Sequence, residues 1–160
     1  MYLAVETRRL PDQSNAPAYS NGMSLALEVR RPGGKQEAVD PSTLKRGDNA
    51  LIAVKLTPSG ARSVADYVID MPLPACFEPG DASNFAQASK EYELRREARD
   101  DRVVIFTRPY DAKAGETLEF LVPVSVVTSG EFAFPGATAE AMYIPEVNAR
   151  SASARIAIVK

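Results

Sequence analysis

Because the sequence contains no histidine, its carboxylates are the side chains best suited to chemistry. The 160-residue chain contains no histidine, which is the usual general base, the usual partner of a nucleophilic serine or cysteine, and the commonest zinc ligand. Two carboxylate pairs stand at short spacing, Asp100 with Asp101 and Asp66 with Asp70. Paired carboxylates carry out glycoside hydrolysis, so a carboxylate-only enzyme is the catalytic class that the residue types leave open.

Both carboxylate pairs also have a structural explanation, which we favour. The first pair lies in RDDR, where Arg99 and Arg102 neutralise its charge, and aspartate favours turns because its side chain bonds the nearby backbone. The second pair has a spacing that places outward-facing charges on one face of a strand. We therefore expect a polar turn and a strand face at these positions, and no catalytic residue.

Cys76, in LPACFEPG, is the single cysteine of the chain. Because no second cysteine or histidine is present to lower its pKa, we expect a buried or half-buried, inert thiol and no intrachain disulfide. The sequence lacks a DxDxDG calcium loop, a GxGxxG fingerprint and a GxxxxGK phosphate loop. We expect no cofactor and no metal, although calcium ligation by loop acids such as Asp48 and Asp81 stays open.

Composition indicates a globular domain without a nucleic-acid or membrane role. Hydrophobic residues make up 45% and charged residues 25%, and the net charge is −2 from 19 basic and 21 acidic residues. No basic field of the kind that phosphate backbones need is present, so nucleic acid is not an expected partner. No apolar run reaches the length of a membrane span, and the N-terminus MYLAVETRRLPD lacks the features of an export signal. We expect a fragment of a longer protein, opening on a strand.

The elements that must position any site are β-strands, because apolar residues alternate in short runs between glycine-containing turns. In MSLALEVR, Met23, Leu25, Leu27 and Val29 share one face. Further runs are NALIAVKLT, VADYVIDM, DRVVIFT, SARIAIVK and the longest, ETLEFLVPVSVV, where Pro123 indicates an edge strand or a bulge. The chain is predicted to be all-β, an antiparallel sandwich of about seven to nine strands.

One boundary and one ambiguous segment complete the predicted organisation. Residues 1–20 are expected to form an N-terminal strand and a polar, proline-bearing connection, and residues 21–160 a single sandwich domain. The stretch DASNFAQASKEYELRRE, residues 81–97, has the alanines and charge pairs of a short helix, but we favour a loop followed by a strand.

The segment ATAEAMYIPEVNARS, residues 137–151, sets Met142, Tyr143 and Ile144 directly before Pro145 among small and polar residues. In a strand, neighbouring side chains point to opposite sides, so one of the first two would join the core. In a turn at the end of a strand, Tyr143 would pack on its own sheet. A surface built to meet another molecule is the third interpretation, because exposed apolar patches mark interfaces.

Two blocks, residues 40–79 and 99–151, contain LKRGD, DMPLPACFEP, RDDRV and VTSGEFAFPGATAEAMYIPEVNARS in this order. From about Asn21 onward the chain resembles the C-terminal macroglobulin-like domain of bacterial alpha-2-macroglobulins. Cys76 stands where this family more often has glycine or another small residue. The resemblance implies a fibronectin- or immunoglobulin-like module of a large periplasmic lipoprotein that traps proteases. In that family, cleavage of a bait region triggers a rearrangement, and in many members an internal thioester captures the attacker.

The resemblance also implies a role for the Met-Tyr segment. The chain itself has no CxEQ thioester motif, so the expected function is non-catalytic packing on the thioester domain of the parent chain, with proteases met only through the full-length protein. Met142 and Tyr143, with Ile144 and Glu146, would form the interdomain contact that keeps water from the thioester. The alternative is a repeat module of a bacterial surface adhesin or stalk, which DMPLPACFEPG also fits, and a carboxylate enzyme ranks last.

Overall fold

A computed structural model describes residues 15–33, 35–59, 66–80, 93–107 and 115–160. These residues form twelve β-strands, a short 3-10 helix and no α-helix. Within the described part of the chain, no helix has the length and apolarity to cross a membrane. The elements are β1 (Tyr19–Asn21), β2 (Met23–Arg30), η2 (Pro41–Thr43), β3 (Asn49–Pro58), β4 (Tyr67–Pro72), β5 (Phe77–Pro79), β6 (Glu93–Arg99), β7 (Arg102–Thr107), β8 (Leu118–Val126), β9 (Gly130–Phe134), β10 (Thr138–Ala141), β11 (Ile144–Arg150) and β12 (Ala154–Ile158).

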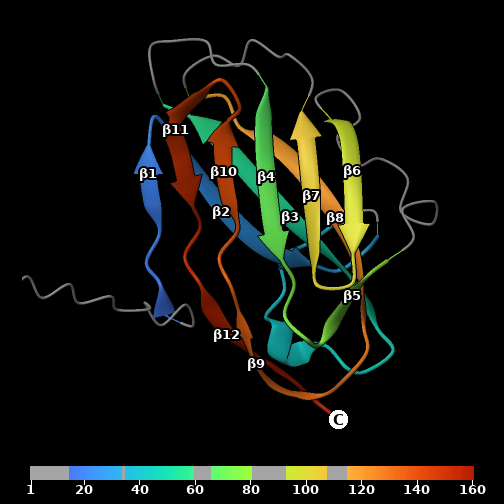
Figure 1. The fold of residues 1–160 in the computed structure, drawn as a ribbon. Coiled ribbons are helices and arrows are strands. Elements are labelled where there is room, and N and C mark those ends of the chain that lie inside the picture. The colour runs from blue at the N-terminus through green and yellow to red at the C-terminus, as the bar shows by residue number, and fades with distance from the viewer. Residues whose placement is uncertain (1–14, 34, 60–65, 81–92, 108–114) are drawn as a thin grey trace, which may run out of the picture.

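Two sheets face each other in a sandwich, as the sequence predicts. One sheet has the order β1-β11-β10-β4-β7-β6 and the other β2-β3-β8-β5, while β12 and β9 form a separate pair. Figure 1 shows the six-stranded sheet in front of the four-stranded one, with β12 and β9 at the lower end. Each strand pairing is antiparallel. The strand count exceeds the expected seven to nine because strands such as β1 and β5, three residues each, are too short to show alternation.

The core lies between the two sheets and is formed by the alternating residues of their inner faces. Ile52, Val54 and Leu56 of β3 are fully buried. The predicted inner face of β8 is buried throughout, and on the opposing sheet Tyr67 and Ile69 of β4 point inward. Burying one such aliphatic side chain contributes about 1.5–3 kcal/mol, so these strands supply most of the driving force for folding.

Pro123 does not mark an edge strand, and this prediction is wrong. β8 lies between β3 and β5 with an unbroken register to β3. The backbone N and O of a strand residue point to the same side, and the Pro123 carbonyl accepts a hydrogen bond from the Gly80 N–H at 2.8 Å. The missing N–H therefore points just past the end of β5, where no ladder partner is required.

Gly22 joins β1 of the six-stranded sheet to β2 of the four-stranded sheet. Its φ is +74°, and a Cβ at this position would lie 3.0 Å from Cγ1 of Val147. Only glycine adopts this conformation cheaply. β1 pairs with β11 on one side of the junction, while β2 pairs with β3 on the other. β1 thus crosses the boundary expected between residues 20 and 21.

The turn predicted at RDDR is confirmed, because Asp100 and Asp101 connect β6 to β7. Residues 93–99 form a strand, as favoured over a helix. The glycine-containing stretch 127–132, which lies between two apolar runs, is only partly a turn, since β9 begins at Gly130. Several expectations lie outside the described residues: the N-terminal strand before residue 15, the start of the run VADYVIDM, the candidate calcium ligand Asp81, the loop over 81–92 and parts of the glycine-containing turns at 57–62 and 111–116.

Candidate interaction surface

Met142 and Tyr143 form the tip of the hairpin between β10 and β11. Ala141 pairs with Ile144, which leaves these two residues as the connection. Both project from the protein, since Tyr143 is 77% exposed and Met142 47%. The turn is confirmed, but the interpretation that places one of the two in the core is wrong, and Tyr143 is largely free of its own sheet.

The tip is held in place by Asp66, the residue directly before β4. The Met142 N–H donates a hydrogen bond of 2.9 Å to the Asp66 carbonyl, and Asp66 has a φ of +62°. Aspartate tolerates this left-handed conformation better than most residues. The conformation of Asp66 thus aims a backbone acceptor at the hairpin tip.

A bulge follows the tip and fixes its direction. Glu140 pairs with Asn148 and Ala141 with Ile144, so residues 145–147 of β11 are unmatched in the register. Two-residue hairpins usually need positive φ values at the tip, but neither tip residue has one. The extra residues of the bulge let the chain turn without them.

Two amide side chains pin the bulge. Asn148 Nδ2 donates to the carbonyl of Pro145 at 2.8 Å and to that of Glu146 at 3.3 Å. Asn21 Nδ2 donates to the Glu146 carbonyl at 2.6 Å. Ile144 is half-buried and packs against the core, while Glu146 is exposed. Of the four predicted contact residues, two therefore project, one anchors the hairpin, and one lies on the bulge.

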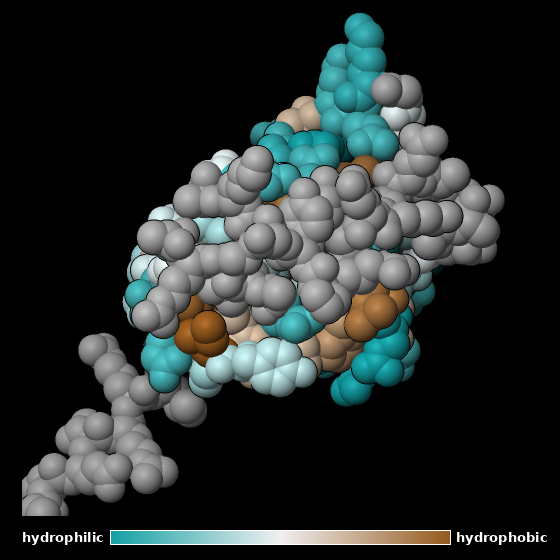
Figure 2. Space-filling model, turned by 90° about the horizontal axis from the view of Figure 1, so that it is seen from above, coloured by the Kyte–Doolittle hydropathy of each residue, from teal (hydrophilic) through white to brown (hydrophobic). Residues whose placement is uncertain are grey.

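Beside the tip lies a hollow of about 520 Å³, which we call the hairpin notch. Among the described residues, five large apolar side chains are exposed, and three of them line this notch: Leu94, Met142 and Tyr143. Viewed from above, separate apolar patches lie among hydrophilic residues (Figure 2). The notch is lined by Asp66, Leu94, Arg95, Phe106, Thr107, Met142 and Tyr143.

The wall of the notch opposite the tip was not predicted from the sequence. Glu93 pairs with Thr107 and Arg95 with Phe106, so Leu94 is the extra residue of a bulge in β6 and is 59% exposed. The Arg95 guanidinium carbon lies 4.6 Å from the centre of the Phe106 ring. The available signal was a single leucine within the charged run ELRREAR, which assigns no partner by itself.

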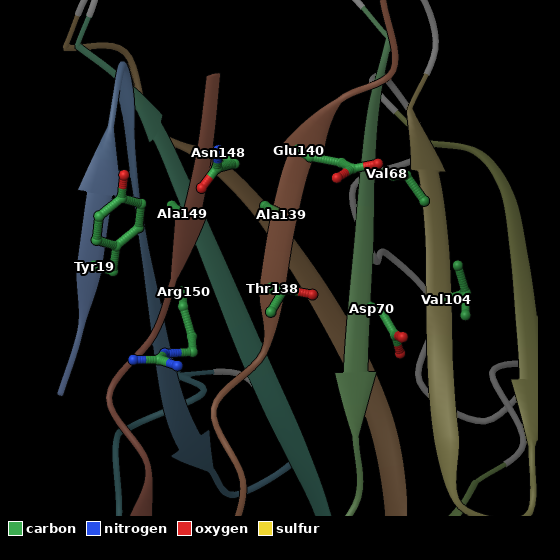
Figure 3. Close-up of a pocket in the computed structure, with 10 residues that line it drawn as sticks. All are labelled: Tyr19, Val68, Asp70, Val104, Thr138, Ala139, Glu140, Asn148, Ala149 and Arg150. Carbon is green, nitrogen blue, oxygen red and sulfur yellow. The ribbon is translucent and has the colours of Figure 1, made fainter. Parts of the chain in front are cut away.

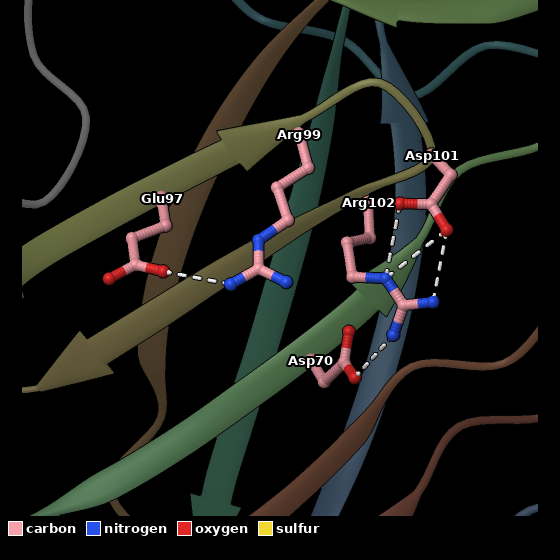
Figure 4. A network of polar contacts seen from close by, with 5 residues as sticks. All are labelled: Asp70, Glu97, Arg99, Asp101 and Arg102. Carbon is pink, nitrogen blue, oxygen red and sulfur yellow. Dashed lines mark hydrogen bonds and ion pairs between the residues drawn. The ribbon is translucent and has the colours of Figure 1, made fainter.

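The carboxylates singled out by spacing do not converge on a reactive centre. Arg102 contacts Asp101 at 3.0 Å and Asp70 at 3.1 Å (Figure 4). The hydrogen bond from Arg102 holds the pKa of Asp101 below its usual range. Asp66 lies at the notch. Among the described residues, no group of three or more acidic or cysteine side chains is arranged to hold a metal ion.

A larger hollow, of about 720 Å³, lies on the outer face of the six-stranded sheet (Figure 3). Arg150, Thr138 and Asp70 face it from neighbouring strands in one cross-strand row. Two of its three charged lining residues, Asp70 and Arg150, contact other parts of the protein, since Asp70 pairs with Arg102 and Arg150 donates to the Pro17 carbonyl at 3.0 Å. Asp70 Oδ1 and Arg150 Nε are buried without a hydrogen-bond partner among the described residues. We call it the outer-face hollow.

Cys76 is fully buried, as predicted. Burial raises the pKa of its thiol to about 11. Because the thiolate is the reactive form, Cys76 is a packing residue.

The structure thus combines a β-sandwich with an exposed apolar hairpin tip. Residues 22–146 match the family model described as the bacterial alpha-2-macroglobulin MG10 domain. The chain therefore belongs to this family, which confirms the resemblance seen in the sequence. A comparison with curated proteins gave no match.

Solved structures of alpha-2-macroglobulins share the fold. An Escherichia coli protein spanning domain MG7 to the C-terminus has a TM-score of 0.75 and 22% identity, over 91% of this chain and 25% of that one. The E. coli protein activated by porcine elastase has a TM-score of 0.76 and 19% identity, over 91% and 14%. The Salmonella protein reacted with methylamine has a TM-score of 0.73 and 21% identity, over 91% and 10%. The chain thus spans a quarter or less of the length of these proteins.

Proposed function

We propose that this domain, residues 21–160 preceded by the N-terminal strand and connecting segment of residues 1–20, is a non-catalytic packing module of a bacterial alpha-2-macroglobulin. It packs on the thioester domain of the parent chain and keeps water from the thioester. Met142 and Tyr143 make the contact, supported by Ile144 and Glu146. The observation that carries this proposal is the exposure of two adjacent apolar side chains on a hairpin tip that the rest of the domain holds in place.

The chemistry of the two side chains suits such a shield. Methionine adapts to an irregular surface, and tyrosine brings a large apolar face with one polar end. An acyl bond survives in water only when solvent is excluded from it. The Asp66 carbonyl and the pinned bulge order the tip before contact, which lowers the entropy cost of packing.

The setting of the parent protein belongs to the same proposal. The parent is a periplasmic lipoprotein that traps proteases, and proteases meet this domain only through the full-length chain. The family match supports this setting over the surface adhesin or stalk module. The E. coli protein was solved after activation by porcine elastase, and the Salmonella protein after reaction with methylamine.

The test replaces both tip residues by alanine in the full-length protein. The rate of methylamine incorporation and the yield of covalent protease capture are then measured. We expect methylamine to react at least about tenfold faster, because a loss of about 1.4 kcal/mol of shielding already gives that factor. Val159→Ala, at an exposed apolar position outside the notch, is the control. Unchanged rates in the double variant refute the shield.

A further inference from the structure

We infer that the hairpin notch receives an apolar side chain from a neighbouring domain of the same parent chain, so that Leu94, Arg95 and Phe106 belong to the contact as much as the tip does. This inference rests on the proposed function and extends it from a projecting tip to a socket beside that tip. The occupant is an aliphatic or aromatic side chain.

The first observation is the gathering of exposed apolar surface in one place. Leu94 comes from β6 and Met142 and Tyr143 from the β10–β11 tip, and the six-stranded sheet places β10, β4, β7 and β6 side by side. Single exposed apolar residues are ordinary, but a cluster around a hollow is typical of an interface. The bulge at Leu94 turns this side chain out of the strand alternation, which bulges do at functional positions.

The second observation is that the notch exists before any partner arrives. Phe106 is placed by its strand, and Arg95 stacks on its ring at 4.6 Å. Below them, Thr107 Oγ1 accepts a hydrogen bond of 2.8 Å from the Tyr67 N–H. On the other side, the Asp66 carbonyl fixes Met142. A preformed pocket that combines an arginine with an aromatic ring is the kind of site in which binding energy concentrates.

The third observation identifies the source of the occupant. The chain covers between 10% and 25% of the alpha-2-macroglobulin chains that share its fold, so other domains of the parent are tethered to it. Tethering gives such a neighbour a high effective concentration, and a modest apolar socket suffices to hold it. A second copy of the chain lacks this advantage, and the experiment separates the two.

The experiment measures how accessible the notch is in the full-length protein. Leu94→Cys and Val159→Cys are made separately, both at exposed positions, against a Cys76 that is buried. Each protein is treated with a maleimide, and the labelled peptide is quantified by mass spectrometry. We expect position 94 to react at least about tenfold more slowly than position 159, since burial in the contact excludes the reagent. Equal rates overturn the inference, and so does protection that disappears on dilution, which indicates a second copy.

A second measurement separates this inference from the proposed function. Leu94→Ser in the full-length protein is expected to raise the methylamine rate severalfold, less than the double alanine variant of the tip. If the tip variant accelerates the reaction while position 94 labels freely, the socket is wrong and the shield stands. If position 94 is protected while the tip variant leaves the methylamine rate unchanged, the socket stands and the shield fails.

Discussion

The hairpin notch and the outer-face hollow lie on the same sheet. The notch is the smaller of the two, but it is the stronger candidate for a partner-binding surface. The outer-face hollow is larger, but two of its three charged side chains contact other parts of the protein, as Asp70 does with Arg102. The notch is lined by apolar side chains that remain exposed to solvent. What distinguishes a contact surface here is apolar area that the described residues leave uncovered, and the volume of a hollow alone is a poor guide.

The largest expected loss of stability comes from a substitution at Gly22, the junction of the two sheets, which lies against Val147 of the bulge. Gly22→Val forces a branched side chain into a positive φ and against Val147, which we expect to cost about 3 kcal/mol or more of unfolding free energy. Denaturant titration of the purified chain measures it. Thr138→Val in the outer-face hollow is the matched control, because Thr138 is exposed, and an equal loss there contradicts the comparison.

A smaller loss is expected when the bulge is released. Asn148→Ala removes hydrogen bonds to the carbonyls of Pro145 and Glu146, which we expect to lower the unfolding free energy by about 1–2 kcal/mol. Asn21→Ala, which removes one bond, is expected to cost less. Amide hydrogen exchange at Met142 and Tyr143 is expected to rise in both variants. Unchanged exchange shows that the bulge does not hold the tip.

The ion pairs beside the outer-face hollow are expected to matter less, and in a pH-dependent way. Arg102 lowers the pKa of Asp101 in the folded protein. The stabilisation is therefore complete above the pKa of the unfolded carboxyl and is lost as the pH falls through the lower, folded value. Arg102→Gln is expected to shift the denaturation midpoint by less than Asn148→Ala does at neutral pH, and to reduce the loss of stability in acid. Denaturation series at several pH values provide the test, and an unaltered acid profile rules out this coupling.

Substitutions at the notch are expected to change the stability of the purified chain least, although they are expected to change contact with the neighbouring domain most. Leu94→Ser, Met142→Ala and Tyr143→Ala change exposed side chains, so each is expected to alter the unfolding free energy of the purified chain by no more than about 0.5 kcal/mol. Thermal and denaturant unfolding measure this directly. A loss above about 1 kcal/mol at any of the three shows that the residue packs within its own domain.

The sequence was a good guide to the fold because burial in a two-sheet sandwich imposes a strict alternation. That alternation is plain in β4 and β7, where every second residue, such as Ile69 and Ile105, is buried. The sequence was a poor guide at Pro123. The rule that proline belongs on an edge strand assumes that a central strand has partners along its whole length. Here β5 ends at Pro79, opposite Val124, so no ladder partner needs the N–H that Pro123 lacks.

The candidate surface was predictable only in part. The Met-Tyr pair stood out as apolar residues in a polar segment, whereas Leu94, Arg95 and Phe106 are distant in sequence and meet the tip only through the strand order. The bulges in β6 and β11 that aim Leu94 and the tip arise from register. Register depends on the whole sheet, so local patterns do not reveal it.

The glycine junction has a consequence for how the protein comes apart. Residues 19–30 run through both sheets, pairing with β11 before Gly22 and with β3 after it. Neither layer can therefore peel away while the other keeps its ladder intact. We expect heat or denaturant to unfold the domain in one cooperative step, in which the β-sheet content and the packing around the aromatic side chains are lost together.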